Sequence, residues 1–336
     1  MALRVSAEVK EKLQQRLGRL LGTEPNVFPG SQAVSFMEKD LASLVEKDYF
    51  VCEKSDGLRS LLYLSCFENK PRGYFIDREY NVEAYDAEHA AKGGQHHTDT
   101  LLDTELVEWD GRVCLVFDII LLNGVFVGGL PLGKRIKLFT ENVLEPCKDK
   151  FPFQLEAKLF QFSYHSRYIL DEIVPSLKHA NDGLVFTPVN SRYKSGTCRE
   201  LLKWKPPEMN TVDFKISVEW KERVPEYALN IAVGKIHRKF AMLEKTEELS
   251  ALDSDPPDGK IAECSLVDGQ WRFLRFREDK TYANDESVVR RIMKSISEDI
   301  TRERLLSVMA GVREKWKARE DETRRRALKR GPEGDA

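Results

Sequence analysis

The chain has 336 residues, of which 41% are hydrophobic, and its 53 basic side chains nearly balance its 55 acidic ones. This length and composition predict two packed domains. The charge balance argues against a general polyanion binder, so any contact with nucleic acid has to come from local clusters. The six cysteines are scattered without a Cys-x-x-Cys pair, which predicts free thiols in a reducing compartment. The only histidine pair, His96-His97, has the spacing of no standard metal site.

The first half of the chain reads as one helix followed by strands. Residues 1–25 carry leucines on one face and basic residues on the other, which predicts an amphipathic helix rather than a signal peptide. From 47 to 130, short apolar runs alternate with turns and predict β-strands. The apolar stretch 113–130 contains Asp118 and the turn signal Asn123-Gly124, so we expect a buried strand and a turn rather than a membrane span.

The second half alternates between helical and strand-like patterns. Helices are expected over 131–145 and 168–179, and strands then return as far as Lys205, where Pro206-Pro207 indicates a hinge. Strand-like runs between 213 and 276, with a loop at 252–259, fit a small β-barrel. The pattern is helical again from 285, and the charged tail 315–330 is either an exposed helix end or a basic segment that serves as a nuclear address or an RNA contact.

The segment around Lys54 is the main candidate for chemistry. Lys54 lies between two apolar, strand-like runs and is followed by Asp56, Gly57 and Arg59. A lysine amine is a nucleophile only without its proton, and neighbouring cations or a metal ion favour that form. Gly57 permits a tight turn, and Arg59 offers a fork of donors to a phosphate or sugar oxygen. On its own, the segment is more commonly a charged surface turn.

Other charged clusters lie further along the chain. Lys203 and Lys205 are two residues apart, so in a strand they would share a face and require an anion between them. Arg275 and Arg277 have the same spacing, with Asp279 and Lys280 following. Carboxylates set against apolar runs, as expected for metal ligands or ribose contacts, occur in 103–107, 116–118 and 182–186.

Together and in this order, these segments resemble the signature of covalent nucleotidyltransferases, and specifically of mRNA capping guanylyltransferases of the fungal type. The resemblance runs from about residue 28 to about residue 284, through segments 28–36, 54–59, 75–78, 103–107, 116–118, 182–186, 201–206 and 275–280. It departs from the family pattern at Ala33, Thr104 and Ala283, which stand where proline, glycine and proline are usual. Thr104 stands directly before Glu105, a residue of the expected site.

The resemblance implies an α+β architecture. A nucleotidyltransferase domain of ligase-like, ATP-grasp-like antiparallel sheets with helices would occupy 1–213, and an OB-fold with terminal helices would occupy 214–330. The implied activity is that of a monofunctional mRNA guanylyltransferase with a covalent lysyl–GMP intermediate. The GMP is taken from GTP and transferred to a 5′-diphosphate RNA end.

The resemblance also implies roles for individual residues. Lys54 would be the nucleophile. Arg59 and Glu105 would hold the ribose, Phe117 would stack on guanine unless it is an ordinary core residue, and Lys203 and Lys205 would bind the α-phosphate. The remaining nucleotide contacts would come from Arg78, Arg275, Asp279 and Lys280, the last three clasping the β- and γ-phosphates. The metal ligands for Mg²⁺ or Mn²⁺ would be Glu105, Asp182 and Asp213, with Asp182 alternatively orienting Lys54.

The family implies a nuclear protein with several partners: 5′-diphosphate RNA, a separate RNA 5′-triphosphatase subunit and the phosphorylated tail of RNA polymerase II. Two rival functions stay open at this point. An ATP-dependent polynucleotide ligase shares the lysine segment and the paired lysines, although segments 75–78 and 201–206 look more like capping enzymes. A catalytically silent binding module is the other, and the intact Lys54, Glu105, Lys203 and Lys205 argue against it.

Overall fold

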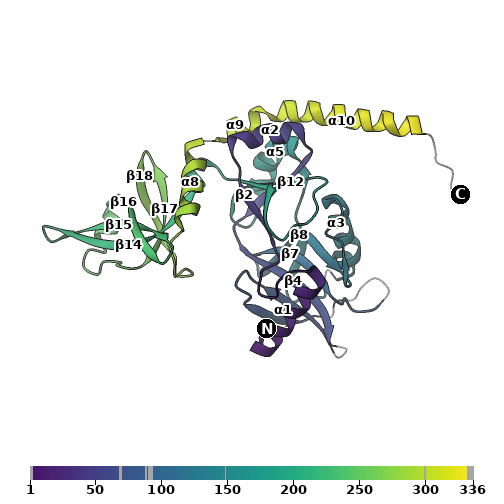
Figure 1. The fold of residues 1–336 in the computed structure, drawn as a ribbon, viewed down its shortest axis with the longest axis horizontal. Helices are drawn as coiled ribbons and strands as arrows, with labels where there is room; N and C mark the ends of the chain where they lie inside the picture. Colours follow the sequence, from purple (N-terminus) through teal and green to yellow (C-terminus); the bar gives the residue numbers. More distant parts are fainter. Residues whose placement is uncertain are drawn as a thin grey trace. The chain divides into compact units, whose positions relative to one another are not determined.

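The computed structural model describes residues 3–67, 70–87, 89, 94–147, 149–298 and 300–330, and it divides into two compact units (Figure 1). The first unit comprises Met1–Val34, Asp40–Trp204 and Leu306–Ala336, and the second comprises Ser35–Lys39 and Lys205–Leu305. This division falls ahead of the expected boundary after residue 213, because Asp213 lies inside a strand of the second unit. The C-terminal helix, expected with the barrel, belongs to the first unit.

The larger sheet of the first unit has eight strands in the order β1-β6-β5-β4-β7-β8-β10, with β9 paired to β8. All pairs are antiparallel except β8 with β10. The predicted turn at Asn123-Gly124 is present, with both residues at positive φ. The strands are β1 (Leu3–Arg4), β4 (Leu58–Phe67), β5 (Lys70–Ile76), β6 (Val82–Asp86), β7 (Thr100–Glu108), β8 (Arg112–Leu122), β9 (Val125–Phe126) and β10 (Gln154–Ala157).

Helix α1 (Ala7–Leu21) packs on one face of this sheet through Leu13 and Leu17. The Ser6 side chain caps its start, and Gly22, at φ 64°, ends it in the left-handed conformation that glycine adopts without strain. The helix therefore begins later than the predicted residue 1, because Leu3–Arg4 pair with β6 instead. Residues 1 and 2 of that prediction lie outside the described part of the chain.

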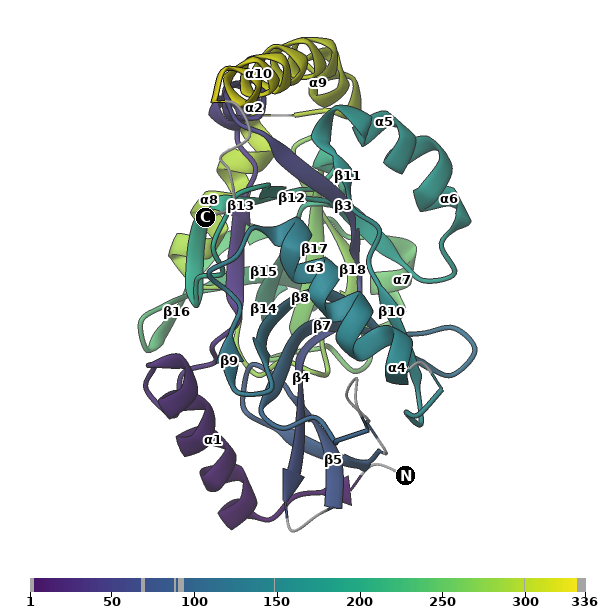
Figure 2. The ribbon, with the colours of Figure 1, turned by 90° about the vertical axis from the view of Figure 1, so that its right-hand side faces the viewer.

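The opposite face of the sheet is covered by α3 (Leu132–Phe139), a π-helical turn (Thr140–Leu144) and α4 (Glu145–Cys147). Figure 2 shows this helical segment lying across β7, β8 and β10. The helix expected over 131–145 is thus confirmed. Its buried contacts include Phe139 and Val143.

The smaller sheet of the first unit has the order β11-β3-β12-β13-β2. Its strands are β2 (Ser31–Ser35), β3 (Tyr49–Ser55), β11 (Gln161–Phe162), β12 (Asn181–Pro188) and β13 (Gly196–Trp204), and α2 (Glu38–Glu46) precedes β3. The helix expected over 168–179 runs instead from Ser163 through 3-10, α and π turns to Ser176. It ends early because Leu177 is extended, which leaves His179 in the connection to β12.

After α8 (Glu286–Glu298) and α9 (Arg302–Ser307), α10 (Met309–Arg330) returns to the first unit, as Figure 1 shows for its start beside α2 and α5. The Trp316 ring lies 5.1 Å from that of Phe162 and 5.2 Å from that of Tyr164. Arg319 binds the carboxylate of Asp48 at 2.7 Å. Beyond this anchor the side chains are exposed as far as residue 326.

The second unit is built on a five-stranded antiparallel sheet in the order β16-β15-β14-β17-β18. The main-chain pair Leu243–Trp271 joins the chain after β16 to β18, which curls the sheet toward closure as in a small barrel. The elements are β14 (Thr211–Lys221), β15 (Val224–Val233), β16 (Ile236–Met242), α7 (Glu247–Ser250), β17 (Ile261–Val267) and β18 (Gln270–Phe276). This is consistent with the expected OB-fold, and the loop at 252–259 is confirmed.

Two further expectations concern the whole chain. All six cysteines are free, and five of them are buried, as predicted for a protein without disulfides. Among the described residues, none of the helices combines the length and apolar character needed to cross a bilayer.

Candidate active site

The Lys54 amine lies at the end of β3 in the smaller sheet, facing the neighbouring strand β12. Its Nζ donates to Asp182 Oδ1 at 2.7 Å, and the two side chains are 25% and 17% exposed, so solvent or a ligand can reach both. β12 positions Asp182 because Leu184 pairs with Glu53 and the register shifts between Asn181 and Leu184. The candidate nucleophile is therefore held in place by a carboxylate.

A buried ion pair lies on the opposite face of β3, where alternation places the neighbours of Lys54. Lys158 Nζ donates to the Glu53 carboxylate at 2.8 Å and to the Glu53 carbonyl at 2.9 Å. Ser55 Oγ donates to the same carboxylate at 3.0 Å. These bonds fix the backbone on both sides of Lys54.

Arg59 follows on β4, in the larger sheet. Its Nε and Nη2 bind the two oxygens of Asp103 at 3.0 and 2.6 Å, and Tyr193 Oη donates to Asp103 at 2.5 Å. Asp103 is fully buried, and burial raises the pKa of the Tyr193 hydroxyl well above its ordinary value. The predicted ribose contact Arg59 is thus already committed to a carboxylate, which fixes its orientation.

Phe117 lies on β8 beside Arg59. The Arg59 guanidinium is 5.4 Å from the centre of the Phe117 ring. The ring is half-buried rather than part of the closed core, so part of it is accessible to a ligand. Asp118, next in sequence, faces the other way and is held by Arg135 at 2.6 and 2.8 Å, which makes it a structural carboxylate.

Arg78 lies after β5, at the edge of the same region. Desolvation, and then the nearby Arg59 guanidinium, lower its pKa, while Glu105 and Asp103 act in the opposite direction. Within the described residues Arg78 has no hydrogen-bonding partner of its own, so its donors are available to a ligand.

Glu105 lies on β7, paired in register with Arg59. Burial raises the pKa of its carboxyl, and Lys158, Lys54 and Arg59, in that order, oppose the rise. Its carboxylate makes no hydrogen bond to any other described residue. A half-buried carboxylate without a donor, surrounded by cations, is suited to binding a substrate hydroxyl or a cation.

These carboxylates allow the predicted metal site to be tested. Mg²⁺ prefers oxygen ligands and is often held by one or two carboxylates together with substrate phosphates. Glu105 and Asp182 fit that pattern. Asp213 belongs to the second unit, where its carboxylate is occupied by Arg277 and Lys280. In the described part of the chain no group of three acidic, histidine or cysteine side chains forms a ready-made metal cage.

The paired lysines are separated by the end of a strand. Lys203 lies in β13, opposite Val185 of β12. β13 ends at Trp204, so Lys205 lies outside the strand and at the start of the second unit. The expectation that both lysines occupy one strand is therefore not met.

The remaining predicted contacts lie in the second unit. Asp213 is buried and binds Arg277 Nη1 at 3.1 Å as well as the Lys280 amine. Arg277 also binds Asp279 through two parallel bonds of 2.9 and 2.8 Å. Arg275 pairs with Glu263 at 2.7 Å, with its side chain 62% exposed, and the same carboxylate lies 3.7 Å from Arg277 Nη1. Arg277, rather than Arg275, links the charged cluster of this unit.

Thr104 is accommodated without breaking the pairing of β7 with β4. It is fully buried, and its Oγ1 donates to the Ser60 carbonyl of β4 at 2.6 Å. The register with β8 shifts between Asp103 and Thr104. The residue that departs from the family pattern thus tethers β7 to β4 beside Glu105.

The structure adds four residues to the predicted site: Asp103, Lys158, Tyr193 and Arg277. Asp103 and Arg277 lie inside segments that the sequence had already singled out. Lys158 and Tyr193 carry no local signal, because their roles depend on which strands pair.

The comparisons with known proteins point to one family. The family profile described as "mRNA capping enzyme, catalytic domain" matches residues 1–207, and that of "mRNA capping enzyme, C-terminal domain" matches residues 209–306. The mRNA-capping enzyme subunit alpha of Schizosaccharomyces pombe is 39% identical, covering 90% of this chain and 85% of the relative. The protein of the same name from Neurospora crassa is 33% identical, covering 91% and 90%. A solved mycobacterial DNA ligase D, complexed with ATP and MES, is 15% identical with a TM-score of 0.43, covering 75% of this chain and 95% of that one.

Proposed function

The chain belongs to the mRNA capping enzyme family, and from this premise we propose that it is an mRNA guanylyltransferase with Lys54 as its nucleophile. The observation that carries the assignment is the Lys54–Asp182 pair, at 2.7 Å, in the catalytic domain of that family. GTP is the substrate. The product is RNA with a GpppN end.

The reaction proceeds in two displacements. The Lys54 amine, having lost a proton, attacks the α-phosphorus of GTP; the bond to the β-phosphate oxygen breaks and pyrophosphate leaves. A terminal phosphate oxygen of 5′-diphosphate RNA then attacks the same phosphorus, the phosphorus–nitrogen bond breaks, and Lys54 regains a proton. Two in-line steps replace one difficult encounter.

The other side chains position the nucleotide and neutralise the charge on its phosphates. Asp182 orients the Lys54 amine, Arg59 and Glu105 hold the ribose, and Phe117 stacks on the guanine. Arg78, Lys203 and Lys205 bind nucleotide oxygens, and Arg275, Asp279 and Lys280 of the second unit serve the β- and γ-phosphates. The charge on the phosphate oxygens makes such electrostatic positioning the main source of catalysis.

A divalent cation, Mg²⁺ or Mn²⁺, would be held by Glu105 and Asp182, with Asp213 as a third candidate. When bound, it supplies neutralisation of phosphate charge. Asp182 and Asp213 are held in place by the ion pairs described above, and Glu105 by its position in β7.

The name "subunit alpha" of the relatives implies a partner subunit. We assign that place to a separate RNA 5′-triphosphatase, which would produce the diphosphate end. The phosphorylated tail of RNA polymerase II would recruit the enzyme to nascent transcripts in the nucleus.

Covalent labelling tests the proposal. The protein is incubated with Mg²⁺ and α-labelled GTP or ATP, then denatured and separated. We expect label from GTP alone, lost in Lys54→Ala and kept in Lys12→Ala, which removes an exposed lysine of α1. Label from ATP instead would assign a ligase-type activity, and no label from either nucleotide would contradict catalysis by this site.

A further inference from the structure

Residues 28–31, which lead into β2, belong to the family pattern, but the function proposed above gives them no role. The Gly196 N–H of β13 donates to the Gly30 carbonyl at 3.1 Å and holds this segment against the smaller sheet. A Cβ on Gly30 would lie 2.2 Å from Phe28 Cε1. Only glycine therefore lets the Phe28 ring fold back along the segment.

The ring of Phe28 lies beside the guanidinium of Arg59. Its centre is 6.0 Å from Arg59 Cζ, and the centre of the Phe117 ring is 5.4 Å from the same atom. Both distances allow cation–π attraction, which is stronger where water is excluded. Phe28 is 8% exposed and the Arg59 side chain is 12% exposed, so little water reaches this contact.

The same segment reaches Arg59 a second time, through hydrogen bonds. The Ser31 N–H donates to Tyr193 Oη at 2.9 Å, and Tyr193 Oη donates to Asp103 at 2.5 Å. Asp103 in turn accepts both bonds from the Arg59 fork. Groups linked in such a chain polarise one another, which makes each bond stronger than it would be alone.

Tyr193 is fixed by the loop that carries it. Its N–H donates to the Gly128 carbonyl at 2.7 Å, and Arg135 Nη1 donates to the Ser191 carbonyl at 2.7 Å. Burial raises the pKa of the Tyr193 hydroxyl well above its ordinary value, so the group keeps its proton and remains a donor. Asp103 therefore receives this bond from a rigid support.

Arg59 keeps donors for a ligand. A guanidinium carries more N–H groups than one carboxylate can accept. Asp103 binds Nε and Nη2, and no other described residue accepts a hydrogen bond from Arg59, so Nη1 is available. The direction in which Nη1 points is set by the contacts that fix the plane of the fork.

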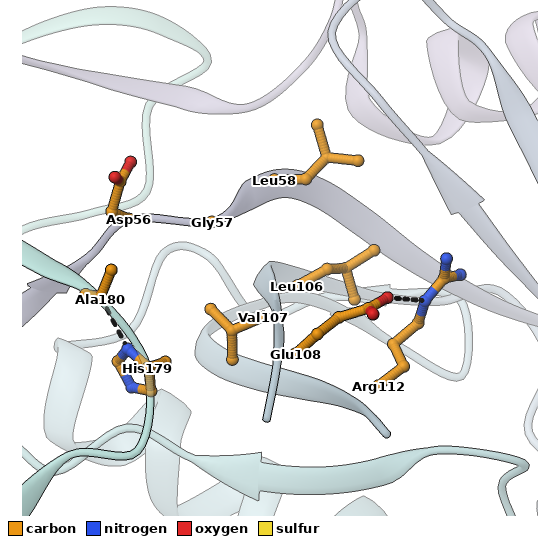
Figure 3. A pocket seen from close by; sticks show the side chains of 9 residues that line it. All are labelled: Asp56, Gly57, Leu58, Leu106, Val107, Glu108, Arg112, His179 and Ala180. Atoms are coloured by element: carbon orange, nitrogen blue, oxygen red, sulfur yellow. Dashed lines mark hydrogen bonds and ion pairs between the residues drawn. The ribbon is translucent and has the colours of Figure 1, made fainter. Parts of the chain in front are cut away.

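These contacts share one face of the larger sheet. Alternation along β4 places Arg59 on the same face as Tyr63. Tyr63 packs in one core cluster with Phe28 and Tyr193. Leu58 lies on the opposite face, where it lines a separate pocket of about 300 Å³ that includes none of the residues around Arg59 (Figure 3).

We propose that Phe28 and Tyr193 are positioning residues for Arg59, Phe28 through its ring and Tyr193 through Asp103. Together they hold the guanidinium in the orientation that the ribose of GTP requires. The proposal rests on the proposed guanylyltransferase function, in which Arg59 contacts the ribose. Because Lys54 is not part of this arrangement, the two residues affect GTP binding and leave the attack on the α-phosphorus unchanged.

Tyr193→Phe removes only the hydroxyl and so tests the hydrogen-bonded route. Equilibrium dialysis with α-labelled GTP measures the dissociation constant in the Lys54→Ala background, where no covalent product forms. We expect Tyr193→Phe to raise this constant about three- to tenfold, as for the loss of one hydrogen bond, and Phe28→Leu to raise it about two- to fivefold. With Lys54 intact, the rate of enzyme–GMP formation at saturating GTP should stay within about twofold of the wild-type rate.

The same core contains a matched control. Tyr63 donates to Asp99, which also binds Arg16 Nε at 3.0 Å, so the same three residue types meet at a second point. Arg16 lies on α1 and has no place in the proposed site. Tyr63→Phe should therefore lower the melting temperature about as much as Tyr193→Phe does, and it should leave the GTP dissociation constant unchanged.

A double-mutant cycle shows whether the two residues act through Arg59. Arg59→Lys keeps the positive charge but has no fork to orient. Adding Tyr193→Phe or Phe28→Leu to Arg59→Lys should therefore change the dissociation constant by less than about twofold. Effects as large as those in the protein with Arg59 would show a purely structural role and overturn the proposal.

Two other results would also overturn it: a dissociation constant that neither single variant changes, or one that Tyr63→Phe raises as much as Tyr193→Phe does. Failure of the proposed function is a separate result. A wild-type protein that binds GTP but forms no enzyme–GMP would contradict the guanylyltransferase activity, while the dialysis would still report on the orientation of Arg59.

Discussion

Arg59 binds both oxygens of the buried Asp103, at 3.0 and 2.6 Å, while its guanidinium lies 5.4 Å from the centre of the Phe117 ring. One side chain thus joins β4, β7 and β8 at the point where we place the guanosine. The pair is rigid because a bidentate bond fixes the plane of the guanidinium. A nucleotide meets a surface that is already arranged.

Removing Asp103 should therefore cost both stability and nucleotide binding. Asp103→Ala leaves the Arg59 charge largely buried without a partner, and we expect the free energy of unfolding to fall by about 3–5 kcal/mol. Denaturant titration measures the loss. Glu8→Ala, which breaks an exposed pair on α1, should change the free energy of unfolding far less, because water screens that pair. Equal losses for the two variants would contradict this account of Asp103.

Asp182 should matter for rate more than for folding. Asp182→Asn keeps the shape of the side chain but removes the charge that orients the Lys54 amine, so we expect enzyme–GMP formation to slow on the order of 100-fold. Single-turnover labelling measures this. Asp110→Asn, in the exposed turn between β7 and β8, is the matched control. An unchanged rate in Asp182→Asn would remove Asp182 from the site.

The low-pH limb of the pH profile of enzyme–GMP formation should report on the protonation of Glu105. Burial raises the pKa of this carboxyl, and Lys158 is the strongest of the groups that lower it. Lys158→Met should therefore raise the pKa further. A carboxyl with a raised pKa keeps its proton to higher pH, so enzyme–GMP formation should be lost at a higher pH in Lys158→Met than in the wild type. Lys158→Arg, which keeps the charge, should leave the limb in place.

The raised pKa of Glu105 also determines how the stability of the fold depends on pH. A folded-state pKa above the unfolded value means that folding favours the protonated form, so Glu105 lowers the free energy of unfolding as the pH rises above its ordinary pKa. Glu105→Gln should remove enzyme–GMP formation without destabilising the fold at neutral pH. Thermal unfolding at pH 5 and pH 8 checks this, and a marked loss of stability at pH 8 would show that the carboxylate has a partner in the fold.

Thr104 should contribute to stability through its hydroxyl. Thr104→Val keeps the volume but removes the 2.6 Å bond to the Ser60 carbonyl, and we expect a loss of about 1–3 kcal/mol by denaturant titration. Thr104→Ser keeps the donor and should lose less. If the two variants were equally stable, the hydroxyl would have no structural role.

The sequence predicted the elements better than it predicted their partners. The helix of residues 7–21, the strand that carries Lys54 and the strands of the barrel follow from local periodicity and turn residues. Local pattern does not say which strands pair. The Arg59–Asp103 bond depends on the β4–β7 register, and Lys158 reaches Glu53 across more than a hundred residues.

The end of the helix before His179 and the division at Trp204 were missed for a similar reason. The extended Leu177 and the return of α10 to the first unit depend on packing in three dimensions. Trp316 reads as an ordinary residue of a charged helix until Phe162 and Tyr164 are seen beside it. Such contacts override the local signals.

The return of α10 also has a consequence for how the protein is made. A ribosome delivers the chain from its N-terminus, and domains fold as they emerge. Residues 205–305 are therefore synthesised in full before the last stretch of the first unit exists. The unit that carries Lys54 therefore stays incomplete, with the surface around Phe162 and Tyr164 uncovered, until Trp316 and Arg319 have been synthesised.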